Sequence, residues 1–311
     1  MSLNGSKSSF LGRLILLLLF IIGTVFVVAI IGKIASVFVN LKMGEKKPEK
    51  LKDHIVICNW SERGDLIIKE IHSKLAAPET EIIVITEKRI NEQELRSNPA
   101  YEKVYLLRKE PTSPEVLEEA RAHLAKSVII LADRESKDPD AKAALISLAI
   151  TKLKKDSKEK AVSQKKPDSQ KKPHIIAEVT SHQKIQHLKD AGVTEWICCT
   201  DYGLGIIAQC ALKAELSKVY EELLKYSEKT NEIYLVTRDQ YPDSFKGMHF
   251  KEVLGIMNDG KDSQNPAILL GVKRGDDVII NPKGEKFEIE EGDSLIVMAY
   301  KPADLSYLGN K

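Results

Sequence analysis

The residues best placed for ligand chemistry follow an apolar run at residues 54–58. In the dinucleotide-binding turn GxGxxG, the three glycines make the tight turn, admit the pyrophosphate, and let the helix pack against the strand. The corresponding positions here are Asn59, Ser61 and Gly64. Asparagine tolerates left-handed backbone geometry and serine is small and can cap a helix, so we expect the shape of the turn to persist.

Three further side chains complete this predicted nucleotide site. Trp60 lies within the turn, and Arg63 falls on the first turn of the expected helix, where it could meet a phosphate. Glu87 ends the second expected strand, where an acidic residue can hydrogen-bond ribose hydroxyls. The ligand would then be NAD(H) or an adenine nucleotide. The alternative is purely structural: Ser61 caps a helix, Glu87 is solvated, and Arg63 pairs with a surface acid.

A second group of candidate ligands is acidic and lies near the ends of the fourth and fifth expected strands. Its members are Asp133, Glu135, Asp138, Asp140 and Glu178. Carboxyl ends of adjacent parallel strands lie together, and oxygen ligands suit a hard cation such as Ca²⁺. Helix capping is the competing interpretation, because Asp138 immediately precedes Pro139 at a plausible first helical position.

The histidines and cysteines show no comparable pattern. The histidines near the expected crevice and helices are His72, His123, His182 and His187. They show neither zinc spacing nor a clear catalytic acid–base pair, so we do not expect an enzyme. The cysteines are Cys58, Cys198, Cys199 and Cys210. Without CxxC or metal-type spacing they predict reduced, buried thiols in a cytosolic setting.

Six short β-branched runs, separated by helical patterns, must position these residues. The expected strands are 54–58, 81–86, 103–107, 127–132, 174–179 and 195–199. The expected helices are 62–75, 90–97, 114–122, 139–153 and 182–191. Strands that are apolar on both faces and separated by helices predict an α/β fold with a parallel sheet covered on both sides. We therefore expect a doubly wound, Rossmann-like domain over residues 54–200.

Three other segments have distinct compositions. Residues 154–173 are lysine-rich and apolar-poor, which predicts a disordered insertion or, alternatively, a surface for anionic lipid. Residues 201–229 carry apolar positions at helical spacing and predict a helical crossover, packed either against another subunit or within an internal core. Residues 230–311 predict a small β-rich α+β domain with the strands EIYLV, AILLGVKR, DVIINP, KFEIE and DSLIVMAY.

An apolar segment precedes both domains. Residues 14–31 carry no charge, and their length falls within the roughly 17–25 residues of a membrane-spanning helix, which we place at 14–39 after a tail at 1–13. A secretory signal peptide is the alternative. Lysines follow in a basic linker at 40–53, so the positive-inside rule predicts a single-pass protein of the cell membrane with cytoplasmic domains. The total of 47 basic and 45 acidic residues gives no reason to expect a nucleic-acid partner.

Many of these stretches together resemble one family. RCK domains of the TrkA-N type, which regulate potassium conductance, are similar to DHIVICNWSERGDLIIKEI, EIIVITEK, RKEPTSPEVLEEA, SVIILADRESKDPDAKAALISLAI and HIIAEV. The small C-terminal subdomain of that family, the TrkA-C type, resembles NPAILLGVKRGDDVIINPKGEKFEIEEGDSLIVMAY. Residues 12–40 look like the pore-lining inner helix of a channel. The asparagine-tryptophan-serine and acidic features are also similar to bacterial relatives of Castor and Pollux channels.

The resemblance implies a homo-oligomeric gating ring, tetrameric or octameric, that pulls on inner helices when a ligand binds. Glu178 matches a position that contributes to calcium binding in some members, but Thr180 stands where a second acid is often found. No filter-like sequence precedes Leu14, so we do not expect the chain as written to conduct ions by itself. It would be either a truncated channel chain or a subunit that joins pore-bearing partners. The expected function is the cytosolic, ligand-sensing gating portion of a potassium or other cation channel. The alternatives are a membrane-tethered, nucleotide-sensing regulator of a potassium transporter and an NAD-dependent oxidoreductase.

Overall fold

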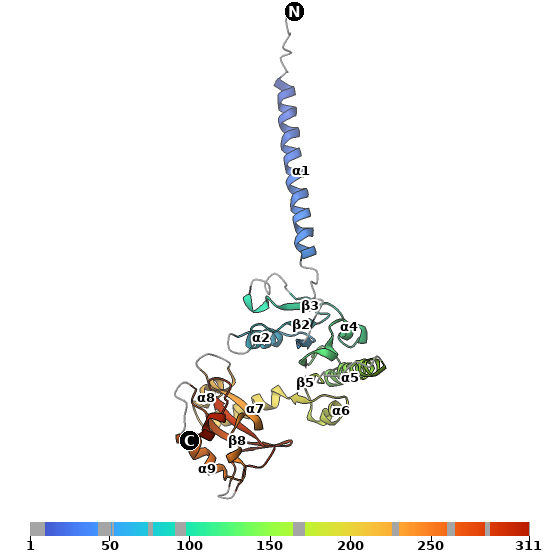
Figure 1. Ribbon diagram of the computed structural model, residues 1–311. Helices are drawn as coiled ribbons and strands as arrows, with labels where there is room; N and C mark the ends of the chain where they lie inside the picture. The colour runs from blue at the N-terminus through green and yellow to red at the C-terminus, as the bar shows by residue number, and fades with distance from the viewer. Residues whose placement is uncertain are drawn as a thin grey trace, which may run out of the picture.

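The computed structural model describes residues 10–42, 51, 53–73, 77–90, 98–163, 172–225, 230–259, 265–283 and 287–310. Figure 1 shows a long N-terminal helix, an α/β domain and a smaller domain that contains the C-terminus. The N-terminal helix is α1, Phe10–Lys42, and it extends away from the α/β domain. Its large apolar side chains are exposed where they are described, as at Phe20 and Val28. In the described part of the chain, no helix has the combination of length and apolar character that crossing a membrane requires.

Six parallel strands form the larger sheet, in the order β3-β2-β1-β4-β5-β6. The strands are β1 (Ile55–Cys58), β2 (Ile82–Ile85), β3 (Val104–Leu107), β4 (Ser127–Ile130), β5 (His174–Glu178) and β6 (Glu195–Ile197). Ile55 is in register with Ile82 of β2 on one side and with Ser127 of β4 on the other. The chain therefore builds outward from β1 in one direction and then from β4 in the other. This confirms the predicted Rossmann-like sheet and places its switch point between β1 and β4.

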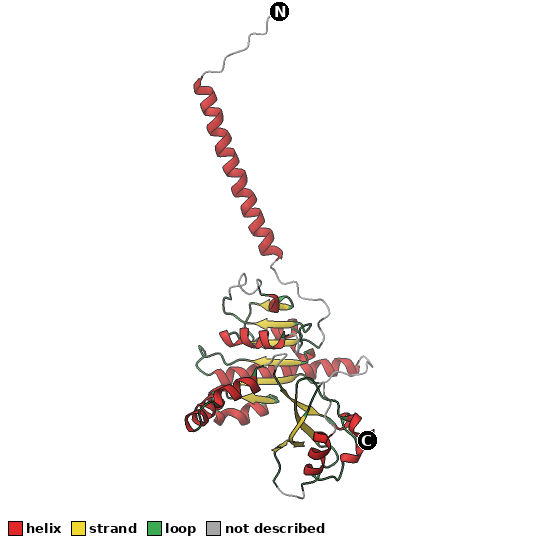
Figure 2. Ribbon diagram, turned by 90° about the vertical axis from the view of Figure 1, so that its left-hand side faces the viewer, coloured by secondary structure: helices red, strands yellow, loops and turns green. Residues whose placement is uncertain are grey.

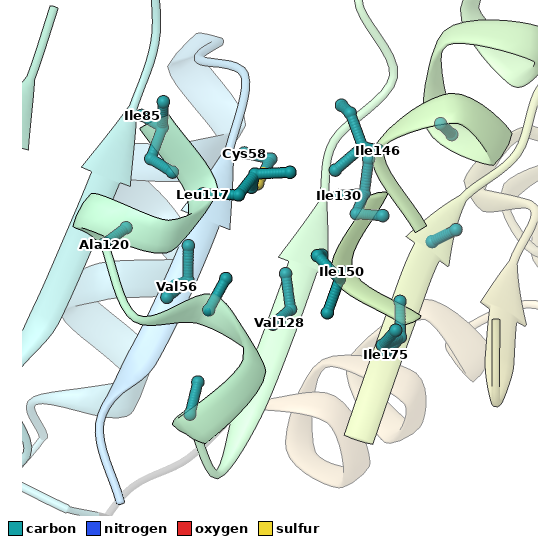
Figure 3. Packing of buried hydrophobic residues seen from close by; sticks show 14 of the residues in the cluster. Val56, Cys58, Ile85, Leu117, Ala120, Val128, Ile130, Ile146, Ile150 and Ile175 are labelled. Atoms are coloured by element: carbon teal, nitrogen blue, oxygen red, sulfur yellow. The ribbon is translucent and has the colours of Figure 1, made fainter. Parts of the chain in front are cut away.

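Helices cover both faces of this sheet, as Figure 2 shows. They are α2 (Glu62–Ile71), α4 (Pro114–Glu119), α5 (Pro139–Ser163) and α6 (Ile185–Asp190). Side chains alternate between the faces of a strand, so Val56 enters one core cluster and Ile57 the other. In the first cluster, β1 and β4 pack against Leu117 of α4 and Ile146 of α5 (Figure 3). Burial on both faces explains why the sequence shows continuous apolar runs.

The prediction of a disordered insertion over residues 154–173 is wrong for the first half of that segment. Helix α5 continues without a break to Ser163, and Lys154 is only 5% exposed. The first proline of the segment is Pro167, so the preceding residues can extend a helix that the apolar part of α5 has already nucleated. Residues 164–171 lie outside the described residues, as does nearly all of the helix expected at 90–97.

The crossover consists of α7 (Cys199–Leu212) and α8 (Leu216–Leu224). None of the residues in these two helices is buried, and Ile207 and Leu212 are 65% and 85% exposed. The interpretation that the crossover helices pack within an internal core is therefore wrong. The strand expected at 195–199 ends at Ile197, and Cys199 starts α7 as an exposed thiol, contrary to the expectation that the cysteines are buried. Cys58 and Cys198 are buried as expected, and Cys210 is partly buried.

The C-terminal domain has a separate antiparallel sheet in the order β7-β10-β8-β9. Its elements are β7 (Glu232–Val236), α9 (Phe250–Asp259), β8 (Ile268–Arg274), β9 (Asp277–Ile280) and β10 (Ser294–Ala299). Helix α9 was not expected; it packs against β8 and buries Val253 in the core of this domain. The strand expected at KFEIE is wrong, because in its described part Glu288 makes only an isolated bridge to His249. The two domains thus have separate cores, as expected.

Candidate functional site

A pocket of about 300 Å³ lies at the carboxyl ends of β1, β2 and β4. Its lining residues are Asn59, Trp60, Thr86, Glu87, Lys88, Pro111, Asp133, Glu135 and Lys142. In open α/β sheets, ligands bind in the crevice at the switch point, and this pocket occupies that position. Three residues predicted for nucleotide binding and two predicted for metal binding therefore share one cavity.

Asn59 joins three strand ends. Its backbone has a φ of 68°, which confirms the left-handed geometry expected of this position. Its N–H donates to the carbonyl of Ile85 at 2.9 Å, and its side-chain amide donates to the carbonyl of Leu131 at 2.8 Å. The backbone of Asn59 thus fastens the end of β1 to the end of β2, and its side chain fastens it to the end of β4.

Gly64 allows α2 to lie close to the turn. A Cβ atom at this position would lie 2.9 Å from two ring carbons of Trp60 and 3.5 Å from the Cδ1 atom of Leu131. This is the close helix–strand packing expected of the third glycine position. Because Gly64 and Trp60 are in contact, Gly64 also determines where the Trp60 ring lies at the pocket wall.

Ser61 and Arg63 do not line the pocket in this structure. Ser61 is the residue before α2, but its hydroxyl makes no capping bond; the hydroxyl oxygen is buried and has no partner among the described residues. Arg63 forms an ion pair with Glu178, at the end of β5. Glu178 is only 8% exposed, so the prediction that Arg63 pairs with an acid is correct, but that acid is not on the surface.

Two lysines neutralise the carboxylates of the pocket. The Nζ atom of Lys142 lies 3.1 Å from Asp133 Oδ2 and 3.3 Å from Glu110 Oε1. Burial alone would lower the pKa of Lys142, but these two carboxylates raise it above its usual value. The Nζ atom of Lys88 lies 2.8 Å from Glu135 Oε1 and 3.6 Å from Asp133 Oδ1. For Asp133, burial opposes ionisation, but the hydrogen bond from Lys142 outweighs it and lowers the pKa.

Glu87 at the pocket rim is coupled to Glu110. A side-chain hydrogen bond and charge repulsion between the two carboxyls raise the pKa of Glu87. Burial would raise the pKa of Glu110 as well, but hydrogen bonds with Glu87, Thr112 and Lys142 lower it. Of the two carboxyls, Glu87 is therefore the one that keeps its proton to the higher pH. A protonated Glu87 can both donate a hydrogen bond to a ligand hydroxyl and accept one from it.

The five predicted metal ligands are not brought together. Asp140 is buried and accepts hydrogen bonds from the backbone N–H and hydroxyl of Thr180, at 2.8 and 2.9 Å, and from the N–H of Ser181. Asp138 accepts from Ala141 at 3.0 Å, which supports the capping interpretation. Glu178 Oε2 accepts from the N–H of Ala132 at 3.1 Å. Only Asp133 and Glu135 of the predicted set line the pocket.

One group of potential metal ligands, outside the predicted set, was missed by the sequence reasoning. Within the described residues, a single set of at least three such side chains has ligand atoms within 4.8 Å of one another, and it comprises His182, Cys198 and Asp201. These residues follow β5 and β6, at the other half of the sheet: His182 comes after β5, and Cys198 and Asp201 lie at the start of α7. Cys198 and Asp201 are three positions apart, but only the pairing of β5 with β6 brings His182 to them.

Comparison with known protein families divides the chain in the same way as the fold. Residues 50–184 match the family described as the calcium-activated potassium channel slowpoke-like RCK domain. Residues 204–306 match the family described as Castor and Pollux, part of voltage-gated ion channel. The calcium-gated potassium channel TvoK of Thermoplasma volcanium is 24% identical over 298 residues, which cover 90% of this chain and 77% of that protein.

One solved structure supports the fold. The human SLO3 gating ring matches with a TM-score of 0.54 and 19% identity, over 80% of this chain and 44% of that one. A GsuK channel bound to NAD matches with a TM-score of 0.38 and 15% identity, over 95% of this chain and 47% of that one. The second likeness is too weak to bear on ligand binding here. This chain spans less than half the length of these two solved chains.

Proposed function

We propose that this chain, whose residues 50–184 match the slowpoke-like RCK domain family, is the ligand-sensing gating portion of a cation channel. The observation that carries the proposal is the convergence of three strand ends and the turn before α2 on one pocket at the switch point. Ligand bound there would contact β1, β2 and β4 together, and so could shift the loops between these strands and their helices. This is a regulatory role and requires no catalytic group.

The ligand best suited to the pocket is an adenine nucleotide or NAD(H). The Glu87–Glu110 pair sits at the end of β2, where ribose hydroxyls bind in such folds. The unpartnered hydroxyl of Ser61 and the N-terminus of α2 supply donors for a phosphate. The guanidinium group of Arg63 could contact a phosphate only if its ion pair with Glu178 broke. Phosphate binding would therefore be coupled to the loss of this ion pair between α2 and β5.

Calcium is the second ligand to test, since TvoK is named as calcium-gated. Asp133 and Glu135 offer the carboxylate oxygens that Ca²⁺ prefers. The ammonium group of Lys88 already lies against both carboxylates. Calcium binding in this pocket would therefore require that Lys88 move away, and a nucleotide is the simpler occupant.

Binding can be measured on the full chain in detergent by isothermal titration calorimetry with NAD⁺, ADP or CaCl₂. The chain has two tryptophans, and Trp60 lines the pocket, so a Trp196→Phe background makes fluorescence report on the pocket itself. We expect NAD⁺ or ADP to change Trp60 fluorescence saturably, and Glu87→Ala and Ser61→Arg to weaken binding at least about tenfold. Glu118→Ala, on the exposed face of α4, is the matched control. Heat of binding that neither Glu87→Ala nor Ser61→Arg changes would contradict the assignment.

We also propose that α1 is anchored in the cell membrane with the two domains in the cytoplasm, and that α7 and α8 pack against a further copy of the chain in a ring. Support for the anchor comes from the uncharged run at residues 14–31 and the exposure of its described side chains. Support for self-association comes from the exposed apolar positions of α7 and α8.

Vesicle flotation and light scattering test these two points. Val25→Arg should reduce the membrane-bound fraction, because an arginine at the centre of a membrane helix costs about 2.5–3.5 kcal/mol, whereas Val25→Leu should not. Ile207→Glu should lower the molar mass of the assembly. Unchanged flotation of Val25→Arg would exclude the anchor, and an unchanged mass would exclude this interface.

A further inference from the structure

The cluster of His182, Cys198 and Asp201 lies at the carboxyl edge of the sheet, away from the switch-point pocket. Strands β5 and β6 are parallel neighbours, with Glu178 in register with Ile197. The N–H of Val179 donates to the carbonyl of Ile197 at 3.0 Å, so the loop after β5 stays bound to the end of β6. His182 follows in that loop, whereas Cys198 and Asp201 belong to the start of α7.

From this arrangement we infer that the three side chains form a binding site for Zn²⁺ or a similar transition-metal ion. Their ligand atoms lie within 4.8 Å of one another. Zinc bonds of about 2.0–2.3 Å in a tetrahedron place ligand atoms about 3.3–3.8 Å apart. His182 and Asp201 form an ion pair that is closer than this, so a metal would have to separate their ligand atoms while both stay within reach of Cys198. Such movements are within the reach of side-chain rotation for His182 and Asp201, which are 61% and 46% exposed.

The donor set determines the class of metal. A thiolate, an imidazole and a carboxylate together suit Zn²⁺, whereas Ca²⁺ and Mg²⁺ take oxygen ligands almost exclusively. The ion would therefore be distinct from the calcium considered for the pocket. Cys198 is 4% exposed and would supply a buried thiolate ligand, whereas His182 and Asp201 would supply ligands from the protein surface. Three protein ligands leave a fourth tetrahedral position for water or another donor.

A metal at this position would act on the connection between the two domains. Cys198 is the residue before α7, and its carbonyl accepts hydrogen bonds from the N–H groups of Asp201 and Tyr202 at 3.1 and 3.2 Å. Zinc would link this first turn of α7 to the loop after β5. The start of the crossover helix would then be held to the sheet, whether or not the pocket binds a nucleotide.

The test uses the full chain in detergent, free of any oligohistidine tag and stripped of metal by chelation. Competition with a fluorescent zinc chelator should give one Zn²⁺ per chain. Co²⁺ should produce a thiolate-to-cobalt charge-transfer absorption band. Cys198→Ser should abolish this band, and His182→Gln should weaken zinc binding at least about 100-fold, since even changes to groups behind the ligands cost about 10–100-fold.

Matched controls use neighbouring residues of the same type. Cys199→Ser and His187→Ala should keep both the band and the affinity, because these exposed side chains lie outside the cluster. His182→Gln is a surface change, so it keeps the test valid if Cys198→Ser fails to fold. The site is refuted if the wild-type chain binds no stoichiometric Zn²⁺, or if Cys199→Ser rather than Cys198→Ser removes the band.

Discussion

The two halves of the carboxyl edge of the parallel sheet differ in how their polar side chains are paired and how far they are exposed. At the ends of β1, β2 and β4, the described charges are matched by close partners, and Asn59 and Asp133 are mostly shielded from water. At the ends of β5 and β6, His182 and Asp201 form an exposed pair above a buried thiol. The first half joins strand ends while it lines a pocket. We expect the exposed pair of the second half to contribute less to the free energy of unfolding. Variants in the two halves should therefore differ most in stability.

The largest effect is expected at Asn59. Asn59→Ala should lower the free energy of unfolding of the α/β domain by about 2–3 kcal/mol, because alanine is strained at positive φ and leaves the carbonyl of Leu131 without its donor. Asn59→Gly removes only the hydrogen bond and should cost about 1 kcal/mol. Urea unfolding followed by tryptophan fluorescence measures both, since both tryptophans lie in this domain. Equal losses for the two variants would show that backbone strain is not involved.

Lys142 comes next. Lys142→Met should cost about 1–3 kcal/mol, because it leaves the carboxylates of Asp133 and Glu110 without their shared ammonium group. Lys152→Met changes an exposed lysine of the same helix and should stay within about 0.5 kcal/mol of the parent protein. The same urea experiment applies. A loss of similar size in both variants would mean that helix α5, rather than the pocket charges, responds to the substitution.

A smaller effect is expected in the pH dependence. The raised pKa of Glu87 means that the folded chain holds this proton more tightly than the unfolded chain, so its contribution is present at low pH and lost as pH rises through the raised value. Glu87→Gln should therefore remove this loss of stability at the alkaline end of the pH range. The opposite contribution of Glu110, whose pKa is lowered, fades as pH falls. Urea midpoints between about pH 4 and about pH 8 should therefore be flatter on the alkaline side in Glu87→Gln but not in Glu118→Gln.

The smallest effect is expected in the second half of the edge. With metal removed, His182→Gln should change stability by less than about 0.5 kcal/mol, because the pair with Asp201 is exposed and screened by water. The same urea unfolding, in the presence of a chelator, measures this. A loss as large as that of Asn59→Gly would remove the contrast between the two halves.

Local geometry was predictable from the sequence. The positive φ of Asn59 and the close packing at Gly64 follow from residue type and spacing within one turn. The parallel sheet followed from apolar runs separated by helices. The extension of α5 through lysine-rich residues was missed because low apolar content was taken to exclude a helix, whereas a helix that is already nucleated can continue through polar residues.

Contacts between distant segments were not predictable. Arg63 and Glu178 were assigned to different sites, although they form one ion pair between α2 and β5. Glu87 was expected to act alone, but its protonation depends on Glu110, which follows another strand. The KFEIE segment has the composition of a strand, yet its described part contributes only the bridge at Glu288. For the two charged pairs, the partner is set by the order of the strands rather than by local pattern.

The contact between Gly64 and the Trp60 ring has a consequence for how such chains can diverge. A side chain at position 64 would need the space that the indole ring occupies. Among related sequences, a larger residue at one of these positions should accompany a smaller residue at the other. The double variant Gly64→Ala, Trp60→Leu should correspondingly tolerate the added methyl group better than Gly64→Ala alone. The two positions should therefore vary together, although three residues separate them along the chain.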